Sequence, residues 1–390
     1  MNRIILIGNG FDLAHDLETS YQNFIDWLWK DLATNIKKIK DGKFEDGIFL
    51  AKGVIGCSKE GYTDLQNLEL NITNNYVKVT PINSFYEILK AKISLQNWVD
   101  IEEEYYQQIK NILRNDSKEY KNDKGGKTAI EKLNGDFEII KQKLEDYLSH
   151  IVSKGTLSEI RSMHGIFCDS FKHQDFPNNK KILLYNILKN SKDNYYCDAS
   201  LKNIFPPNIL VVNFNYTKTD SIYCNYVKTL NPPNFPSFNI KSINIHGELK
   251  SEENPIVFGY GDELADEYKE LEKTQNKEYF KNIKSIKYLK TNNYRELLNF
   301  ADSDYFQVYT LGHSCGNSDR TLLNTLFEHD NCVSIKPFFH KKEEDGKEIN
   351  DYEEIVINIS RNFPNKKALL RERVVNKTNC FSLPQIIEQC

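Results

Sequence analysis

The sequence predicts an α/β fold: a Rossmann-like, mainly parallel sheet with a large helical insertion after its first βα unit. Three observations favour this fold. The chain opens with an apolar run, a glycine turn and an amphipathic segment. Strand-like runs that end in small or polar residues return after residue 205, and the region between is mostly helical in its periodicity. We therefore expect one core built from residues 1–35 and 205–390, with residues 36–204 as a mostly helical insertion or cap.

The first βα unit spans residues 3–32. The apolar run from Ile4 to Ile7 breaks at Gly8-Asn9-Gly10, and a helix is expected to begin about ten residues later. Thr19 followed by Gln22 predicts a capping box at the start of that helix. Apolar residues recur on one helical face at Tyr21, Phe24, Ile25, Leu28 and Leu32.

Helical patterns dominate the insertion. Residues 40–84 are polar and show no strong period, whereas 85–113 and 156–203 contain helix-like segments. A charged loop at 115–127 precedes a long helix at about 128–152. The packing seam of that helix consists of Leu133, Phe137, Ile140, Leu144, Tyr147 and Ile151.

Strand-like runs then follow one another to the end of the core. They lie at residues 209–212, 242–247, 255–261, 305–311, 333–340 and 353–360. A turn at Asp345-Gly346 separates the last two. After the fourth run, a loop containing Gly312 leads into a helix that Ser318 is placed to cap.

Composition restricts the class of protein. Hydrophobic residues make up 39% and charged residues 27% of the 390 residues, as in soluble globular proteins. The net charge of −4 gives no reason to expect nucleic-acid or membrane binding. No signal peptide is recognisable, no apolar stretch approaches the ~18 residues of a membrane helix, and the eight cysteines lack metal-finger spacing. We expect a cytoplasmic protein with reduced thiols and no bound metal.

Four predicted strands end in small or polar residues. The four segments are Gly8-Asn9-Gly10-Phe11-Asp12, Asn213 to Thr217, His246-Gly247, and Gly312 to Asp319. Ligands of open α/β sheets bind at the carboxyl ends of the strands, so these loops are expected to converge on one site. For the glycine turn two interpretations stay open: an ordinary tight βα turn, or a turn that lets a phosphate approach the backbone.

The other candidates also have a structural interpretation. Asn213 and Asn215 either satisfy local backbone groups or contact a ligand, and Thr217 with Asp220 could cap a helix. A single histidine such as His246 is more often structural, although its place at a strand end favours function. His313 carries a weaker signal, and Ser318-Asp319 is explained at least in part by helix capping. Trp98 and Glu102 share a helical face, which we interpret as a solvated acidic face with a packed Trp.

Several of these segments together resemble one protein family. The segments are IILIGNGFDLAHDLETSYQNF, NWVDIE, VVNFNYT, NIHG, FGYGD, LGHSCGNSD and NISRNFPNKKALLRERV. In this order they resemble the AbiH family of bacterial abortive-infection proteins, which act against bacteriophage. The likeness runs over nearly the whole chain, and the segment beginning GNGFDL is its most specific part.

The same landmarks distantly resemble sirtuin-like NAD-binding domains. That resemblance implies a cofactor-binding turn at Gly8, Asn9, Gly10, Phe11 and Asp12. It implies Asn215 and His246 as catalytic residues that act on the nicotinamide–ribose bond. It also implies further contacts to the nucleotide from Asn213, Thr217, Gly312, His313, Ser314 and Asp319. Thr217 stands where those domains have Asp, and the zinc-binding Cys pairs of protein-deacylating sirtuins are absent from the sequence.

Three functions follow as hypotheses. The first is binding and hydrolysis of NAD or a related nucleotide, with His246 as general base and Asn215 orienting the ribose or a water. The second is a non-catalytic sensor of a nucleotide or phage component that signals to a partner protein through the insertion. The weakest is a nuclease, because the sequence shows neither a clustered acidic metal site nor a basic stripe. A homo-oligomer is compatible with each hypothesis.

Overall fold

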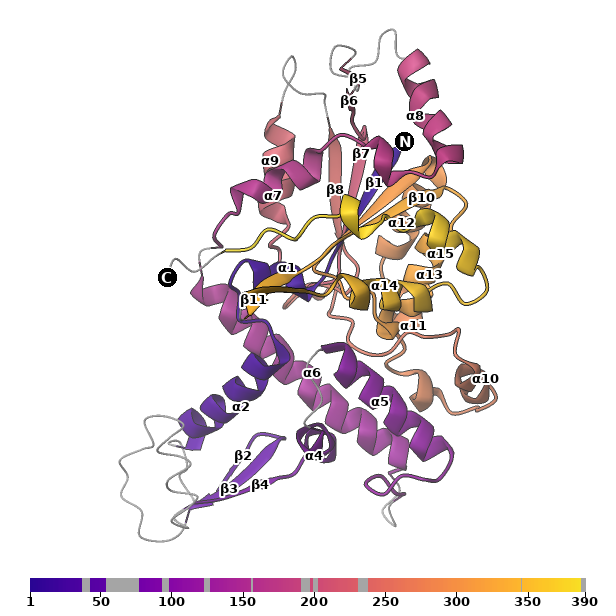
Figure 1. Cartoon of the computed structure of the whole chain (residues 1–390). Coiled ribbons are helices and arrows are strands. Elements are labelled where there is room, and N and C mark those ends of the chain that lie inside the picture. The colour runs from indigo at the N-terminus through magenta and orange to yellow at the C-terminus, as the bar shows by residue number, and fades with distance from the viewer. Residues whose placement is uncertain are drawn as a thin grey trace.

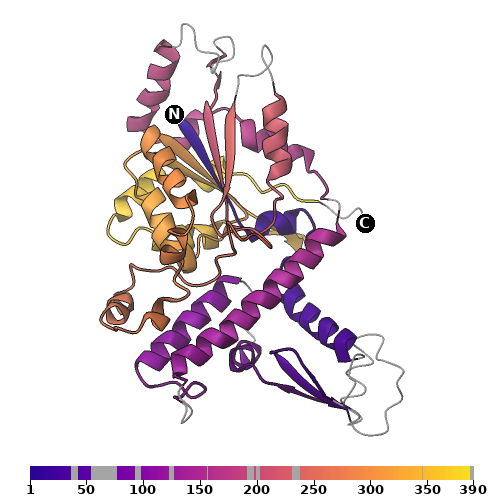
Figure 2. The same ribbon diagram turned by 180° about the vertical axis from the view of Figure 1, so that it is seen from behind.

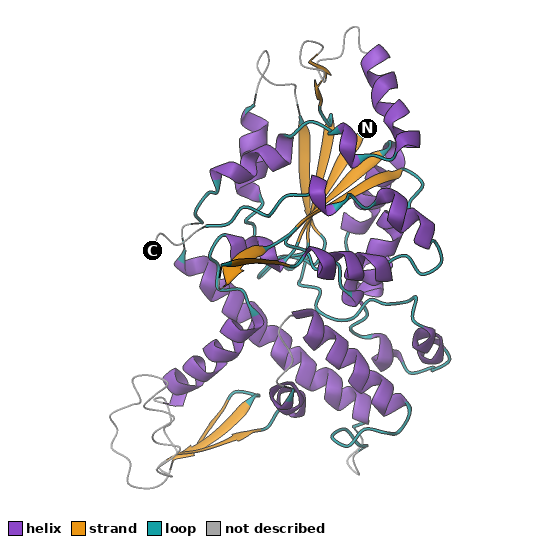
Figure 3. Cartoon of the chain, viewed as in Figure 1, coloured by secondary structure: helices purple, strands orange, loops and turns teal. Residues whose placement is uncertain are grey.

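The computed structural model describes residues 1–36, 43–53, 77–92, 98–122, 127–155, 157–190, 197–198, 203–230, 238–344 and 346–386. Two lobes are visible in Figure 1. The sheet lobe contains the central parallel sheet and its flanking helices. The helical lobe contains α2 (Tyr21–Ile36), α4 (Ser84–Ala91), α5 (Trp98–Leu113) and α6 (Ala129–Lys154) with a small antiparallel sheet. Figure 3 shows this small sheet well separated from the central sheet.

The central sheet has five parallel strands in the order β10-β9-β1-β7-β8. They are β1 (Asn2–Ile7), β7 (Asn208–Asn213), β8 (Asn239–Asn244), β9 (Phe306–Leu311) and β10 (Cys332–Phe338). This is the doubly wound order, with β1 in the centre and the strand order reversing between β1 and β9. The predicted Rossmann-like α/β fold is therefore confirmed.

Helices cover both faces of the sheet because its central strand is apolar on both sides. Ile4 and Leu6 of β1 face one hydrophobic cluster, whereas Ile5 and Ile7 face the other. The first cluster includes α12 (Asn293–Ser303), α13 (Arg320–Phe327), α14 (Tyr352–Arg361) and α15 (Lys367–Arg373). The second includes α1 (Asn9–Ala14), α7 (Arg161–Cys168) and α9 (Ser221–Thr229).

The helical lobe has its own hydrophobic cluster. Its elements are α2 (Tyr21–Ile36), β2 (Lys43–Glu45), β3 (Phe49–Gly53), β4 (Val77–Pro81), α4 (Ser84–Ala91), α5 (Trp98–Leu113) and α6 (Ala129–Lys154). The predicted long helix is α6, and all six residues of its predicted seam are buried. A capping box between Thr128 and Glu131 starts α6 in the helical lobe, and the helix ends beside α1 (Figure 2).

Shorter elements complete the part of the chain that the structure describes. These are α8 (Asn178–Asn190), β5 (Cys197–Asp198), β6 (Asn203–Ile204), α10 (Asp266–Glu272), α11 (Lys284–Tyr288), β11 (Lys341–Glu344), β12 (Lys347–Asn350) and four 3₁₀ turns at His173–Asp175, Lys277–Phe280, Asn317–Asp319 and Lys377–Asn379. The antiparallel β11–β12 hairpin forms around the predicted turn, where Gly346 has φ 72° and Asp345 lies outside the described residues.

The hydrophobic clusters cross the predicted domain boundaries. Helix α2 packs in the helical lobe although its residues were assigned to the core. Helix α7 packs against the sheet although its residues were assigned to the insertion. The insertion also contains the β2–β3–β4 sheet in a region without a strong sequence period. The division at 36–204 remains a prediction about independent domains.

Two predicted strands are wrong. Residues 255–261 form an irregular segment whose Tyr260 makes an isolated bridge to Ile283. Residues 353–360 belong to α14, where Ile355 and Ile359 are buried one helical turn apart. Ile357, which a strand would place beside them, is 53% exposed.

Three predicted helix caps are also wrong. The start of α2 is held by Ser20 and Asn23, with each backbone N–H donating to the other's side chain, rather than by Thr19 and Gln22. Ser318 is fully buried and does not cap α13. The Thr217 hydroxyl donates to Asp12 instead of capping α9.

None of the described helices is long and apolar enough to cross a lipid bilayer. Five cysteines, at positions 168, 224, 315, 332 and 380, are buried free thiols.

Candidate functional site

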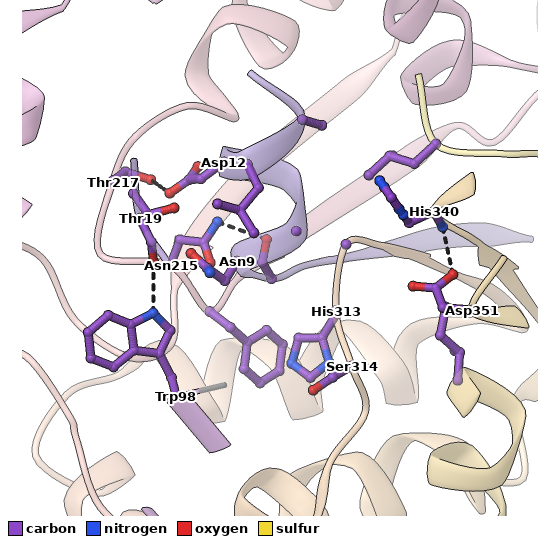
Figure 4. Close-up of a pocket in the computed structure, with 18 of the residues that line it drawn as sticks. Asn9, Asp12, Thr19, Trp98, Asn215, Thr217, His313, Ser314, His340 and Asp351 are labelled. Carbon is purple, nitrogen blue, oxygen red and sulfur yellow. Dashed lines mark hydrogen bonds between the residues drawn. The ribbon is translucent and has the colours of Figure 1, made fainter. Parts of the chain in front are cut away.

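A cavity of about 670 Å³ opens at the carboxyl ends of the strands. Figure 4 shows residues of its wall coming from the loops after β1, β7 and β9, from α5, and from the segment after β10. The structure brings eleven predicted site residues to this wall: Gly8, Asn9, Gly10, Asp12, Asn215, Thr217, His246, Gly312, His313, Ser314 and Asp319. Phe11 and Asn213 are buried behind it and do not line it.

The glycines allow two loops to touch at the point where the strand order reverses. A Cβ on Gly8 would lie 2.6 Å from the His313 Cα, and one on Gly10 would lie 2.9 Å from the Gly312 Cα. Gly312 itself has φ 63°, and a Cβ there would lie 2.1 Å from the Phe11 nitrogen. A side chain at these positions would push the loops apart. The structural interpretation of the turn therefore has direct support.

Several amides of the turn already donate within the protein. The N–H of Gly8 donates to Leu311 O at 3.1 Å, that of Gly10 to Gly312 O at 2.9 Å, and that of Phe11 to Gly8 O at 2.8 Å. A phosphate could not use these three amides. Helix α1 also begins directly at Asn9, whereas the sequence predicted the next helix about ten residues after the turn.

Asp12 is the buried centre of a polar cluster between β1 and β7. Its Oδ2 accepts from the Thr217 hydroxyl at 2.6 Å, and its Oδ1 has no partner among the described residues. Burial raises the pKa of Asp12 to about 6, against the lowering effect of hydrogen bonds from Thr217, Thr219 and Asn215. Close to neutral pH, this carboxyl group is therefore near its titration range.

The two asparagines after β7 have different roles. Asn213 donates from Nδ2 to Thr217 O and Asp220 Oδ1, both at 2.9 Å, so it holds the turn. Asn215 donates from Nδ2 to Gly8 O at 3.0 Å, which ties its loop to the glycine turn. The Asn215 side chain lines the cavity, and Figure 4 shows it beside Asn9.

His246 forms a buried pair with Asp319. The His246 Nε2 lies 3.0 Å from Asp319 Oδ1 and 3.1 Å from the Tyr288 hydroxyl. Burial raises the pKa of Asp319, but Lys284, His246 and His313 outweigh this effect and the net pKa is well below the usual range. An ionised Asp319 can only accept, so Nε2 carries the imidazole proton. The His246 Nδ1 makes no hydrogen bond to the described part of the chain.

His313 has the opposite arrangement of ring nitrogens. Its Nδ1 accepts from the Cys315 N–H at 2.9 Å, and its Nε2 lies 3.8 Å from Asp319 Oδ2. Burial lowers the pKa of His313 to about 4, so the ring is neutral near pH 7. The ring also packs edge-on against Phe214, with centroids 4.1 Å apart, and neighbouring Ser314 is exposed at the rim. His313 therefore forms part of the wall and is not placed as a general base.

Trp98 is packed as expected, but the interpretation of Glu102 as part of a solvated acidic face is wrong. Trp98 donates from Nε1 to Thr19 O at 2.8 Å, and both residues line the cavity. Glu102 is 4% exposed and accepts from Lys284 Nζ at 2.8 Å. The spacing of Glu102 four residues after Trp98 places both on one helical face, which the sequence does show. Nothing in the sequence pairs Glu102 with Lys284, 182 positions later.

Sequence reasoning also missed other residues of the site. Lys284 and Tyr288 on α11 lie in a lysine-rich stretch without a distinguishing pattern. On the far wall, polar residues of β11 and α14 and their approaches line the cavity, namely His340, Lys342, Asp351, Glu354 and Asn358. The His340 N–H donates to Asp351 Oδ1 at 2.7 Å (Figure 4). The described residues contain no group of three His, Cys, Asp or Glu side chains that could hold a metal ion.

A family model described as bacteriophage abortive infection AbiH matches residues 4–340. The chain belongs to the AbiH family. The match begins in β1 and ends just after β10, so it includes the helical lobe, the central sheet and the loops of the cavity that follow β1, β7, β8 and β9. This AbiH protein is accordingly an abortive-infection protein directed against bacteriophage. Neither the curated proteins nor the solved structures give a significant match to it.

Proposed function

We propose that this AbiH protein binds NAD or a related nucleotide in the cavity and hydrolyses its nicotinamide–ribose bond. The observation that carries the proposal is the Asp319–His246 pair, in which His246 Nε2 faces the carboxylate and Nδ1 has no hydrogen bond to the described residues, in a cavity at the switch point of a doubly wound sheet. The resemblance to sirtuin-like domains, read from the same loops, points to the same ligand.

The place and size of the cavity support nucleotide binding. Doubly wound sheets bind nucleotides in the crevice where the strand order reverses, and the loops after β1 and β9 meet at that point. A volume of about 670 Å³ lies within the ~300–1,000 Å³ typical of small-molecule sites. Lys342 is the single Lys or Arg among the described residues of the wall, so we expect it to face the phosphates.

The histidine is arranged as a general base. With the proton on Nε2 held by Asp319, Nδ1 can take a proton from a water that attacks the ribose carbon C1′. The C1′–N bond breaks as nicotinamide leaves with the bonding electrons, and the products are nicotinamide and ADP-ribose. General base catalysis of this kind contributes roughly 10²–10⁴ in rate.

Asn215 is the second residue proposed for the reaction. Because its Nδ2 is fixed on Gly8 O, its amide oxygen is held in one direction and can orient a ribose hydroxyl or the attacking water. Loss of NAD would stop the metabolism of an infected cell, which agrees with an abortive-infection role.

The test measures nicotinamide released from NAD, with purified protein and in phage-infected cells. His246→Ala is expected to lower release by about 10²–10⁴-fold, and Asn215→Ala to lower it as well. His329→Ala is the matched control, because His329 pairs with Asp302 at 3.2 Å on the surface away from the cavity. Release that His246→Ala retains would remove this residue from the chemistry.

The shared wall of the cavity favours a sensor as second candidate. Trp98, Glu102 and Leu148 of the helical lobe line the same cavity as the sheet loops, so an occupant would contact both lobes. Calorimetric titration of the protein with NAD and ADP-ribose separates the two candidates. Tight binding without nicotinamide release, weakened by Trp98→Ala, would favour the sensor.

A further inference from the structure

We propose that Lys284, which Glu102 anchors, is a positioning residue that holds Asp319 as an ionised acceptor and so selects the nitrogen of His246 that can accept a proton. The expected effect on nicotinamide release rests on the proposed hydrolysis. The expected effect on the protonation of the His246 ring does not.

Lys284 is the buried cation of this cluster. It begins α11, is 1% exposed, and directs Nζ at three acceptors within the protein. These are Glu102 Oε2 at 2.8 Å, Asp319 Oδ1 at 2.9 Å and Ser318 Oγ at 3.4 Å. Burial lowers the pKa of Lys284, but the carboxylates of Asp319 and Glu102 outweigh it and raise the net value. Lys284 is therefore a fixed positive charge beside Asp319.

Glu102 anchors that charge from the helical lobe. Besides Lys284, it accepts from the Gly259 N–H at 3.2 Å through Oε1. Burial raises the pKa of Glu102, against the lowering effect of Lys284. Lys284 thus donates to the carboxyl groups of both Glu102 and Asp319. Asp319, which also accepts from His246, stays ionised. The cluster physically joins α5 of the helical lobe to the loop after β9.

Lys284 and Asp319 together determine the protonation state of the His246 ring. The charged and titratable groups that face the His246 ring or act on its pair are Asp319, Lys284, Glu102, His313, Tyr288 and Tyr216. His313 is neutral near pH 7, and burial raises the pKa of both tyrosines well above the usual value. Lys284 is thus the permanent cation of this set. Without Lys284, a second proton on His246 would supply the positive charge that balances the Asp319 carboxylate.

The decisive measurement is the ¹⁵N spectrum of the His246 ring, assigned by comparison with His246→Gln. The double variant Lys284→Met/Glu102→Gln removes the cation and its anchoring carboxylate together, so no buried charge is left unpaired between them. Wild type is expected to show a neutral ring protonated on Nε2 at pH 7. The double variant is expected to show a ring protonated on both nitrogens.

A matched control uses the other buried lysine–aspartate pair of the sheet lobe. Lys336 Nζ lies 3.0 Å from both carboxylate oxygens of Asp175, and this pair lies outside the cavity wall. Lys336→Met/Asp175→Asn removes a comparable pair and is expected to leave the His246 spectrum unchanged. If the double variant at the site fails to fold, Lys284→Gln keeps an N–H donor without the charge and is expected to give the same change.

The pH profile of nicotinamide release is the second readout. In the double variant, its acidic limb is expected to move upward by about one pH unit, because the imidazole is more easily protonated. Glu102→Gln alone keeps Lys284 and should leave the limb near its original position. A His246 ring that is unchanged in both Lys284 variants overturns the proposal. A changed ring in a protein that never releases nicotinamide supports the positioning role and rejects the hydrolysis.

Discussion

At the scale of single residues, the cavity contains ionisable groups that burial and partners shift in opposite directions. Burial raises the pKa of Asp12 to about 6 and lowers that of His313 to about 4. Asp319, equally buried, has its pKa lowered because Lys284 and His246 outweigh its burial. Such differences between neighbouring groups are typical of functional sites, and they make each group separately testable.

Asp12→Asn is expected to remove a pH dependence of stability. Between pH 3.8, the ordinary pKa of an aspartate, and about pH 6, Asp12 is protonated to a greater extent in the folded protein than in the unfolded chain. Its contribution to the free energy of unfolding is thus largest below this window and falls as pH rises through it, by about 3 kcal/mol. The free energy of unfolding is measured with urea at pH 4 and at pH 7. From pH 4 to pH 7, wild type should lose about this much stability relative to the variant. Parallel curves would contradict the prediction.

Gly312→Ala is expected to be far more destabilising than Gly346→Ala. Both glycines have positive φ, at 63° and 72°, so both substitutions incur about 1 kcal/mol of backbone strain. A Cβ on Gly346 meets nothing within 4 Å, whereas one on Gly312 would lie 2.1 Å from the Phe11 nitrogen. The extra loss at Gly312, expected to exceed about 2 kcal/mol, measures the contact between the two loops. Equal melting temperatures for the two variants would reject this interpretation.

The strand-end residues of the site could be predicted because strand ends are local features. Apolar runs that stop at Gly8, Asn213, His246 and Gly312 are visible in the sequence, and parallel pairing brings their ends together. Lys284 could not be predicted, because its role depends on contacts with Glu102 and Asp319 from two other elements. The sequence of the glycine turn indicated that small residues are needed there. It did not indicate that they are needed because the loop after β9, rather than a ligand, contacts the turn.

At the scale of elements, local patterns were reliable when they extended over several turns. The seam runs from Leu133 to Ile151 of the 26-residue helix α6 and predicted that helix over nearly its whole length. The short apolar run at 353–360 fits a strand and a helix equally and forms a helix, whereas the run at 255–261 forms neither. The β2–β3–β4 sheet was missed because its strands are short and mostly polar outside Phe49 to Ala51.

Thr128→Ala is expected to destabilise the protein by about 1 kcal/mol. Its hydroxyl accepts from the Glu131 N–H at 3.4 Å and completes the capping box at the start of α6. Thr128→Ser keeps the hydroxyl and serves as the control, with stability close to wild type. Hydrogen exchange of the first-turn amides of α6 should rise in the alanine variant alone. Equal exchange in both variants would show that the cap is not used.

At the scale of the whole molecule, residues that follow β8 complete the hydrophobic cluster of the helical lobe. Phe258 and Tyr260, from the segment after β8, belong to the cluster of the helical lobe. Phe258 stacks on Phe137 of α6 at a centroid distance of 5.1 Å, and Tyr260 stacks on Tyr106 of α5 at 4.1 Å. The helical lobe therefore depends on residues more than a hundred positions after α6.

The helical lobe is not expected to fold alone. A fragment of residues 15–155 lacks Phe258 and Tyr260 and leaves their stacking partners exposed. Thermal unfolding followed by circular dichroism should show a broad, weakly cooperative change for the fragment. In the full chain, Phe258→Ala is expected to cost about 3–5 kcal/mol. A sharp transition in the isolated fragment would show that the lobe is an independent domain.

The central position of β1 has a consequence for biosynthesis. Residue 3 pairs with residue 209 on one side and with residue 307 on the other, so its neighbours are translated roughly 200 and 300 positions later. At about 5–20 residues per second, this apolar segment waits roughly 15–60 seconds before both neighbours exist. A nascent chain that exposes Ile4 to Ile7 for so long is a natural client for a ribosome-associated chaperone.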